Sequence, residues 1–183
     1  IETDVVYKPW RFIGVGAGFL FTPPIDGNKT YSGEARDKNL RWQIEENRLM
    51  YLFAFRSGVY LYSPPVYLNH DHDVALSFRV SPGVTIPLPP NLSTSVDYVP
   101  KDAIIHVPAT SGEVSNSHAK ACYYHVKFAM ALEVERVSVL LGYTTSDYDL
   151  YGGSRNMIVE GQKIELPRKK QAGTFFIGLT YDF

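Results

Sequence analysis

Apolar and polar residues alternate with a period of two along much of the chain. At its C-terminal end one face of the pattern carries Phe175, Ile177, Leu179, Tyr181 and Phe183. The residues between them are smaller or more polar, such as Gly178, Thr180 and Asp182. Successive side chains of a β-strand point to opposite faces of its sheet, so this pattern predicts a strand over 174–183 with one apolar face.

The same alternation predicts further strands earlier in the chain. They cover 12–21, 49–56, 74–80, 84–88, 123–134 and 137–144, with a weaker candidate at 59–62. Turns are expected at 56–58, 81–83 and 134–136, where Gly, Pro, Ser or charged residues interrupt the alternation. No helix of useful length fits the pattern, so the expected class is all-β.

The connections between these strands alternate in length. Short turns separate long polar segments at 22–44, 63–72, 91–118 and 151–172. This arrangement predicts four hairpins in a single domain over 1–183, with both chain ends on the short-turn side. The expected fold is an eight-stranded antiparallel up-and-down β-barrel. Both a transmembrane barrel and a soluble barrel of the lipocalin type have this strand count.

Charge on the opposite faces favours the transmembrane barrel. Five charged residues lie on the faces opposite the apolar ones, and we interpret them as a lumenal charge network: Arg56, Arg79, Lys127, Glu133 and Asp182. His125 lies on the same face as Lys127. Small and charged residues on one side of each strand, with large apolar residues on the other, are typical of a narrow barrel in lipid. Side chains fill the interior of an eight-stranded barrel, so we expect no open pore.

Composition narrows the class of function. The chain has 18 Lys and Arg against 19 Asp and Glu, a net charge of −1, and no basic tract for nucleic-acid binding. Its single cysteine, Cys122, excludes an internal disulfide and a cysteine-based zinc site. The sequence contains no run of 18 apolar residues, so it predicts no membrane-spanning helix. The first residues lack Met and an apolar leader, as in a mature protein whose signal peptide has been removed.

Candidate chemistry is sparse. His70 and His72 could hold a metal only with a third ligand, such as His118, from another loop. A lipid-modifying acyltransferase would need a nucleophile beside a loop histidine, and loop candidates for these roles are His70, His72, His106, His118, Ser111, Ser115 and Ser117. No spacing marks a catalytic set among them. We therefore expect a non-enzymatic protein without metal or cofactor.

The C-terminal alternation also carries a resemblance. Phe175, Ile177, Leu179, Tyr181 and Phe183 resemble the C-terminal assembly signal of bacterial outer-membrane β-barrels. The number of strands and the lengths of the connections are similar to those of small barrels of the OmpA and OmpX kind. The Pro-rich and Tyr-rich composition resembles that of PorT-like barrels of the Bacteroidota. The resemblance implies location in the bacterial outer membrane among its lipid and lipopolysaccharide, and assembly by the barrel-insertion machinery.

The expected function follows from this architecture. The leading hypothesis is an anchor, scaffold or subunit of an outer-membrane complex, which contacts other outer-membrane proteins through its extracellular loops. The longest loop, 91–118, is the expected contact region. A surface adhesin or ligand-binding barrel is the second hypothesis, and a lipid-modifying outer-membrane enzyme is the third.

Overall fold

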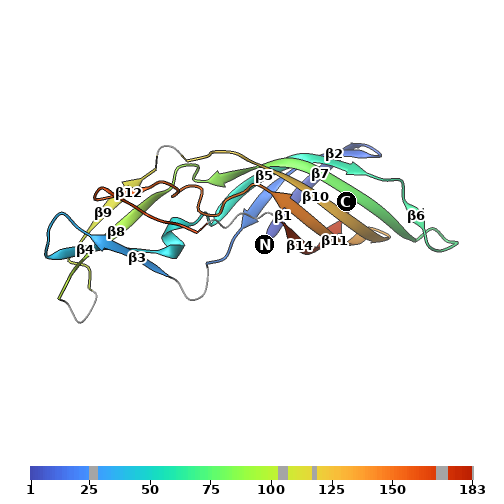
Figure 1. Ribbon diagram of the computed structural model, residues 1–183. Coiled ribbons are helices and arrows are strands. Elements are labelled where there is room, and N and C mark those ends of the chain that lie inside the picture. The colour runs from blue at the N-terminus through green and yellow to red at the C-terminus, as the bar shows by residue number, and fades with distance from the viewer. Residues whose placement is uncertain (25–28, 103–106, 117–118, 168–172, 183) are drawn as a thin grey trace.

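The computed structural model describes residues 1–24, 29–102, 107–116, 119–167 and 173–182, and its architecture is all-β. One curled sheet and a smaller four-stranded sheet lie at opposite ends of an elongated molecule (Figure 1). We call the second one the distal sheet. Among the described residues, no helix is long and apolar enough to cross a membrane.

The curled sheet contains eight strands, seven long and one short. The long strands lie in the order β1-β2-β5-β7-β10-β11-β14, and every pairing between neighbours is antiparallel. Their bounds are Glu2–Trp10 (β1), Ile13–Phe21 (β2), Phe53–Tyr62 (β5), Val74–Leu88 (β7), Tyr123–Val134 (β10), Val137–Ser146 (β11) and Thr174–Tyr181 (β14). The two-residue strand β6, Val66–Tyr67, pairs with β7. No pairing between β1 and β14 is present among the described residues, so closure of the sheet into a barrel is not observed.

Two of the expected turns are wrong. Residues 56–58 and 81–83 lie inside the continuous strands β5 and β7, so the expected short strands on either side of each turn merge. Gly58 and Gly83 face one another in register. Beyond them the β5–β7 pairing lapses and resumes at Leu61 with Val80, so Pro82 lies where the ladder is interrupted. Proline is tolerated within a sheet at such an interruption because it cannot donate a ladder hydrogen bond.

The N-terminal strand β1 was not expected, and it changes the topology. With seven long strands the two chain ends lie at opposite ends of the sheet, not together on the short-turn side. The Ile1 ammonium group donates a hydrogen bond to the Phe21 carbonyl at the end that carries the long connections. The Asp182 amide donates to the Arg136 carbonyl at the other end. The 63–73 connection also lies at that second end, because Val74 pairs with Val134.

Two of the expected long polar segments, 22–44 and 91–118, supply strands of the distal sheet instead of extending as loops. Its order is β3-β4-β8-β9, with bounds Thr30–Glu34 (β3), Leu40–Glu45 (β4), Ser93–Pro100 (β8) and Thr110–Ser115 (β9). A short 3-10 helix, Glu46–Leu49 (η1), leads back to the curled sheet, and a hairpin of Ile158–Val159 (β12) and Gln162–Lys163 (β13) belongs to the 147–173 connection. The expected contact region 91–118 therefore supplies β8 and β9, while 103–106 and 117–118 lie outside the described residues.

The hydrophobic core lies where the two sheets meet, not inside the curled sheet. Leu49 and Tyr51 are buried in this core. The sequence pattern predicts both on the apolar face of a strand, but Leu49 ends the 3-10 helix η1 and Tyr51 lies in irregular structure. Residues from both sheets and from the 147–166 segment complete the core: Leu20, Trp42, Ile44, Met50, Ala54, Leu92, Val96, Tyr123, Tyr148, Leu150, Tyr151, Met157, Val159 and Ile164.

Candidate functional site: a charged interior and an apolar outer face

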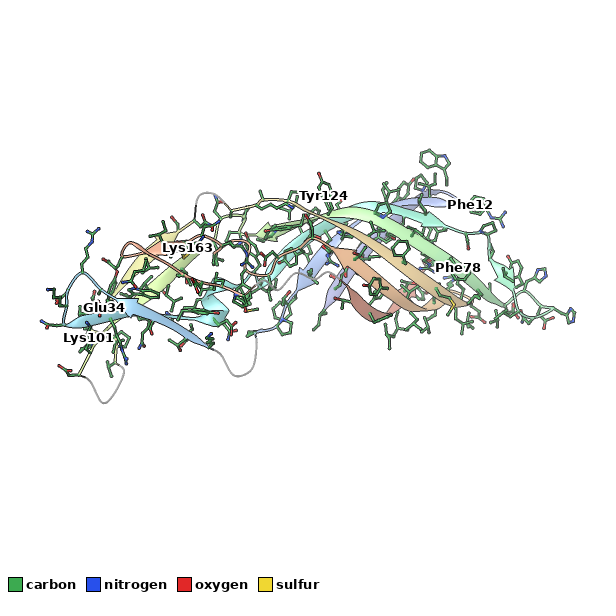
Figure 2. The ribbon with its side chains drawn as sticks, viewed as in Figure 1. Phe12, Glu34, Phe78, Lys101, Tyr124 and Lys163 are labelled. Atoms are coloured by element: carbon green, nitrogen blue, oxygen red, sulfur yellow. The ribbon has the colours of Figure 1, made fainter. Side chains whose placement is uncertain are left out.

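The outer, convex face of the curled sheet is apolar and exposed. On β14 the exposed fractions are 81% for Phe175, 80% for Ile177 and 76% for Leu179. Outward residues of the other long strands are also exposed or half-buried: Val5, Tyr7, Ile13, Val15, Phe19, Phe53, Phe55, Leu76, Phe78, Val84, Val126, Phe128, Met130, Leu132, Val137, Val139, Leu141 and Tyr143. Figure 2 shows Phe78 and Tyr124 on this part of the molecule. An exposed apolar surface of this extent marks contact with a membrane or another protein.

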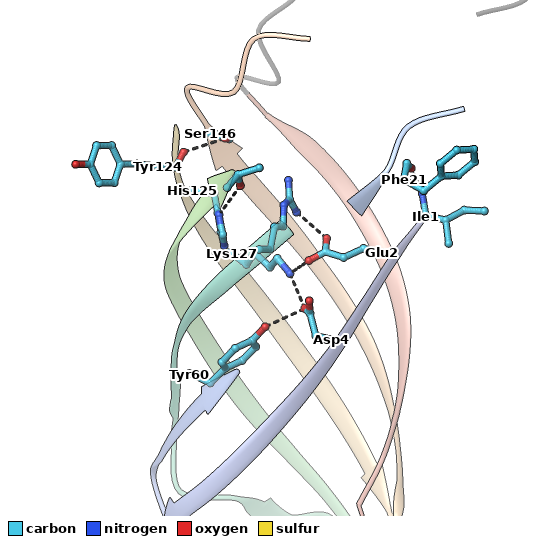
Figure 3. A network of polar contacts seen from close by, with 11 residues as sticks. Ile1, Glu2, Asp4, Phe21, Tyr60, Tyr124, His125, Lys127 and Ser146 are labelled. Atoms are coloured by element: carbon cyan, nitrogen blue, oxygen red, sulfur yellow. Dashed lines mark hydrogen bonds and ion pairs between the residues drawn. The ribbon is translucent and has the colours of Figure 1, made fainter. Parts of the chain in front are cut away.

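The inner face carries a charged cluster toward the distal sheet. Lys127 on β10 forms ion pairs with Glu2 and with Asp4, whose Oδ2 lies 2.9 Å from Lys127 Nζ. Arg56 on β5, which is buried, donates from Nη1 to Glu2 Oε2 at 2.7 Å. Tyr60 donates its hydroxyl to Asp4 at 2.8 Å (Figure 3). Two acids and two bases balance one another, as buried charges require. We call these five residues the upper cluster.

A second cluster lies toward the 135–136 turn. Arg79 on β7 is buried and donates from Nη2 to Glu133 Oε1 at 3.1 Å and to Ser138 Oγ at 3.1 Å. Its Nη1 lies 3.3 Å from the hydroxyl of Thr180 on β14. Ser77 donates to the same Glu133 carboxylate at 2.5 Å. Because β7 and β14 are not neighbours in the sheet, these contacts cross its interior. We call this the lower cluster.

The expected charge network is thus divided between the two clusters, and Asp182 belongs to neither. Arg79 and Glu133 meet in the lower cluster, whereas Arg56 and Lys127 lie in the upper cluster with Glu2 and Asp4. Arg56 was expected near a short turn, and its position is different because β5 continues past it. Asp182 pairs instead with Lys8, Oδ1 to Nζ 3.1 Å, at the two edges of the sheet.

Sequence reasoning missed the acids of the upper cluster. Glu2, Asp4 and Lys8 lie on β1, where the inward-pointing Val6 and the proline at position 9 obscure the apolar alternation. A weaker signal is present, because Val5 and Tyr7 occupy alternate positions that point outward. His125 lies beside the upper cluster, with Nδ1 2.9 Å from Thr85 Oγ1.

A glycine row on the inner face lets the sheet curve beside His125. Gly16, Gly58 and Gly83 lie side by side on β2, β5 and β7, and His125 follows in register on β10. A Cβ at Gly58 would lie 2.6 Å from the Pro82 carbonyl oxygen, and one at Gly83 would lie 2.4 Å from the Ser57 carbonyl oxygen. Glycine in a strand marks this kind of tight bend and close backbone approach.

Aromatic side chains close the interior toward the distal sheet. The Tyr148 ring packs edge-on against Tyr123 at 5.2 Å between centroids and stacks against Tyr51 at 6.2 Å. Burial raises the pKa of the Tyr51 and Tyr148 hydroxyls above the ordinary tyrosine value. Burial, together with a hydrogen bond to Glu46, also raises the pKa of the Tyr151 hydroxyl. These side chains therefore stay neutral and form a packed layer between the two sheets.

Those candidate metal and acyl-transfer residues that the structure describes are not brought together. No group of three or more His, Cys, Asp or Glu among the described residues could hold a metal ion. His72 stacks on Tyr67 at 4.3 Å between ring centroids, in the 63–73 connection. Ser111 and Ser115 lie on β9 in the distal sheet, whereas His106, Ser117 and His118 lie outside the described residues. Phe183, the last residue of the expected assembly signal, also lies outside them.

Comparison with known proteins identifies no relative. No family model, no curated protein and no solved structure matches this chain.

Proposed function

We propose that this protein is a non-enzymatic outer-membrane β-barrel that anchors the distal sheet at the cell surface for contact with other outer-membrane proteins. One observation carries the proposal: the curled sheet is apolar outside and charged inside. A soluble barrel that binds an apolar ligand has the opposite polarity. Only lipid, or an apolar partner around the whole sheet, would cover the convex face.

The interior supports an anchor more than a channel. The upper cluster and the lower cluster each contain side chains that cross from one strand to a non-neighbouring one. Ion pairs of this kind fill the space along the axis of a narrow barrel. The tyrosine layer of Tyr51, Tyr123 and Tyr148 adds a second obstruction toward the distal sheet.

The distal sheet supplies the surface for a partner. Its far end is polar, with Glu34 and Lys101 at the surface (Figure 2). Lys101 Nζ lies 3.4 Å from Glu34 Oε1, and Arg48 Nη1 lies 2.8 Å from Asp97 Oδ2. The shared hydrophobic core holds this sheet against the curled sheet, so a partner would meet a preformed surface. Its surroundings would be lipopolysaccharide, and the barrel-insertion machinery would place it there.

Fractionation tests the location. The protein should remain with outer membranes after extraction with carbonate or high salt, and should migrate differently on gels before and after heating. Release by either extraction without detergent would contradict the proposal.

Photocrosslinking in intact outer membranes tests the partner surface. A photoreactive residue at Lys101 should capture a neighbouring outer-membrane protein. The same residue at Phe12, at the opposite end of the molecule, is the matched control and should not capture that protein. Equal capture at both positions, or none at Lys101, would contradict a partner at the distal sheet.

A further inference from the structure

An open groove with a volume of about 460 Å³ lies where the curled sheet meets the distal sheet. Its walls come from η1, the start of β5, the end of β7 and the start of β8. We call it the junction groove. Its volume is within the range of small-molecule sites, about 300–1,000 Å³, so it is large enough to hold part of a lipid.

The lining of the junction groove changes from apolar to polar along its length. At the curled sheet it includes Phe53 and Leu88, which are register partners and point outward. Phe53 is 49% exposed and Leu88 is 39% exposed, so this end of the groove is continuous with the apolar convex face. At the distal sheet the lining includes Arg48, Ser93 and Ser95. This gradient fits a molecule with an apolar tail toward the convex face and a polar head toward β8.

Carboxylates outnumber cations beside the polar end of the groove. Arg48 Nη1 lies 2.8 Å from Asp97 Oδ2, and Arg48 Nε lies 3.9 Å from Glu45 Oε2. Ser93 donates its hydroxyl hydrogen bond to Glu113. Among the described residues these contacts place three carboxylates and one guanidinium at this end of the groove. Electrostatic complementarity therefore favours a headgroup that carries a positive charge over one that is only anionic.

The same end of the groove has donors for a phosphate. Arg48 Nη1 contacts Ser95 Oγ at 3.0 Å as well as Asp97, and a guanidinium has five N–H donors in all. Thr94, which also lines the groove, is 4% exposed, and its hydroxyl has no hydrogen-bond partner among the described residues. A buried hydroxyl without a partner is costly, so a headgroup that bonds to it would be stabilised.

From these observations we infer that the junction groove binds a zwitterionic phospholipid. The ammonium group of its head would face the three carboxylates, its phosphate would face Arg48, and one acyl chain would lie along Phe53 and Leu88. The inference rests on the proposed function, because the acyl chain would continue along the convex face within the membrane. It goes beyond that function because the bound lipid differs in charge from the anionic lipopolysaccharide around it.

Two photoreactive lipids test the headgroup. Phosphatidylethanolamine and phosphatidylglycerol, each with a diazirine on one acyl chain, are added in trace amounts to phosphatidylglycerol vesicles that contain the refolded protein. Labelling of residues 50–53 and 88–92 should be about two- to fivefold higher with the ethanolamine lipid, the ratio expected for an exposed ion pair. Labelling of β14 should be equal for the two lipids, because its outward residues are uncharged: Phe175, Ile177, Leu179 and Tyr181.

Matched variants test the carboxylates. Glu45→Gln combined with Asp97→Asn should abolish the preference for the ethanolamine lipid at the groove, while labelling of β14 stays unchanged and reports insertion of the variant. Glu34→Gln is the control, because it removes a carboxylate whose partner is Lys101 at the far end of the distal sheet. This control should keep the preference.

The two sites of labelling separate failure of the inference from failure of the proposed function. Labelling of β14 together with equal labelling of the groove by both lipids, or stronger labelling by phosphatidylglycerol, would overturn the inference alone. A preference that persists in the double variant would also overturn it. Absence of labelling on β14 with either lipid would show that the convex face does not contact hydrocarbon, and would overturn the proposed function and the inference together.

Discussion

Lys127 Nζ lies 2.9 Å from Asp4 Oδ2, so β10 and β1, which are not neighbours in the sheet, meet across its interior. The Lys127 side chain is 11% exposed and Asp4 is 20% exposed. The ion pair therefore depends on the curvature of the sheet, because only a strongly curled sheet brings these two side chains together.

Removing Lys127 should destabilise the fold. Lys127→Met would leave Glu2 and Asp4 inside the sheet with Arg56 as their remaining cation in the upper cluster, and breaking a buried ion pair in this way costs about 3–5 kcal/mol. Lys8→Met removes a far more exposed pair, and its cost should stay below about 1 kcal/mol. Urea unfolding of both variants in detergent micelles measures the difference. Equal effects would contradict a buried role for Lys127.

The interior should not conduct ions. The upper and lower clusters span the interior with ion pairs, so the purified protein should show no steady conductance in planar bilayers. The Arg79→Ala variant is a second test of the filled interior, because it removes a side chain that crosses from β7 to β14. It should raise the frequency of transient openings. Stable, ion-selective channels in the unmodified protein would contradict a filled interior.

Gly58 should not tolerate a methyl group. Gly58→Ala would place Cβ 2.6 Å from the Pro82 carbonyl oxygen, and overpacking of this kind costs about 1–3 kcal/mol. Gly178→Ala is the matched control, because its nearest neighbours are side-chain atoms of Leu140 at 3.6 Å. The control should be neutral or slightly stabilising. Refolding yield and urea midpoint would show the contrast, and a tolerated Gly58→Ala would argue against the tight bend.

Neighbouring substitutions on β14 test which face contacts lipid. Leu179→Glu places a charge on the outer face, at a cost somewhat below the roughly 2–4 kcal/mol that Arg or Lys incurs at the midplane. Thr180→Glu places the same group beside Arg79, whose Nη1 lies 3.3 Å from the Thr180 hydroxyl. Leu179→Glu should therefore reduce membrane-inserted protein per unit synthesised, and Thr180→Glu should not. Equal amounts of membrane-inserted protein for the two variants would contradict lipid contact at Leu179.

Local alternation was sufficient to predict the strands with one clear apolar face. On β10, β11 and β14 the inward and outward positions agree with the sequence pattern. Tyr123 and Thr180, for example, point inward, whereas Tyr124 and Tyr181 point outward. The glycines and prolines of β5 and β7 misled the prediction, because the same residues mark a turn or a close backbone approach within a strand.

The distal sheet and the acids of the upper cluster needed long-range information. Leu40, Trp42 and Ile44 alternate on β4 and could have indicated that strand. The polar strand β9 carries little apolar signal, and its pairing with β8 is non-local. Ion pairs such as Lys127 with Glu2 join residues at distant sequence positions, so no local pattern predicts them.

Contact between the convex face and hydrocarbon is the central claim, and spin-label accessibility along β11 tests it most directly. Single cysteines at 138–142 in the Cys122→Ser protein, labelled and inserted into vesicles, report collisions with oxygen and with a water-soluble nickel complex. The account predicts a period of two, with high oxygen and low nickel accessibility at Val139 and Leu141 and low oxygen accessibility at Ser138 and Leu140. High nickel accessibility at Val139 and Leu141 would place that face in water and contradict the membrane barrel.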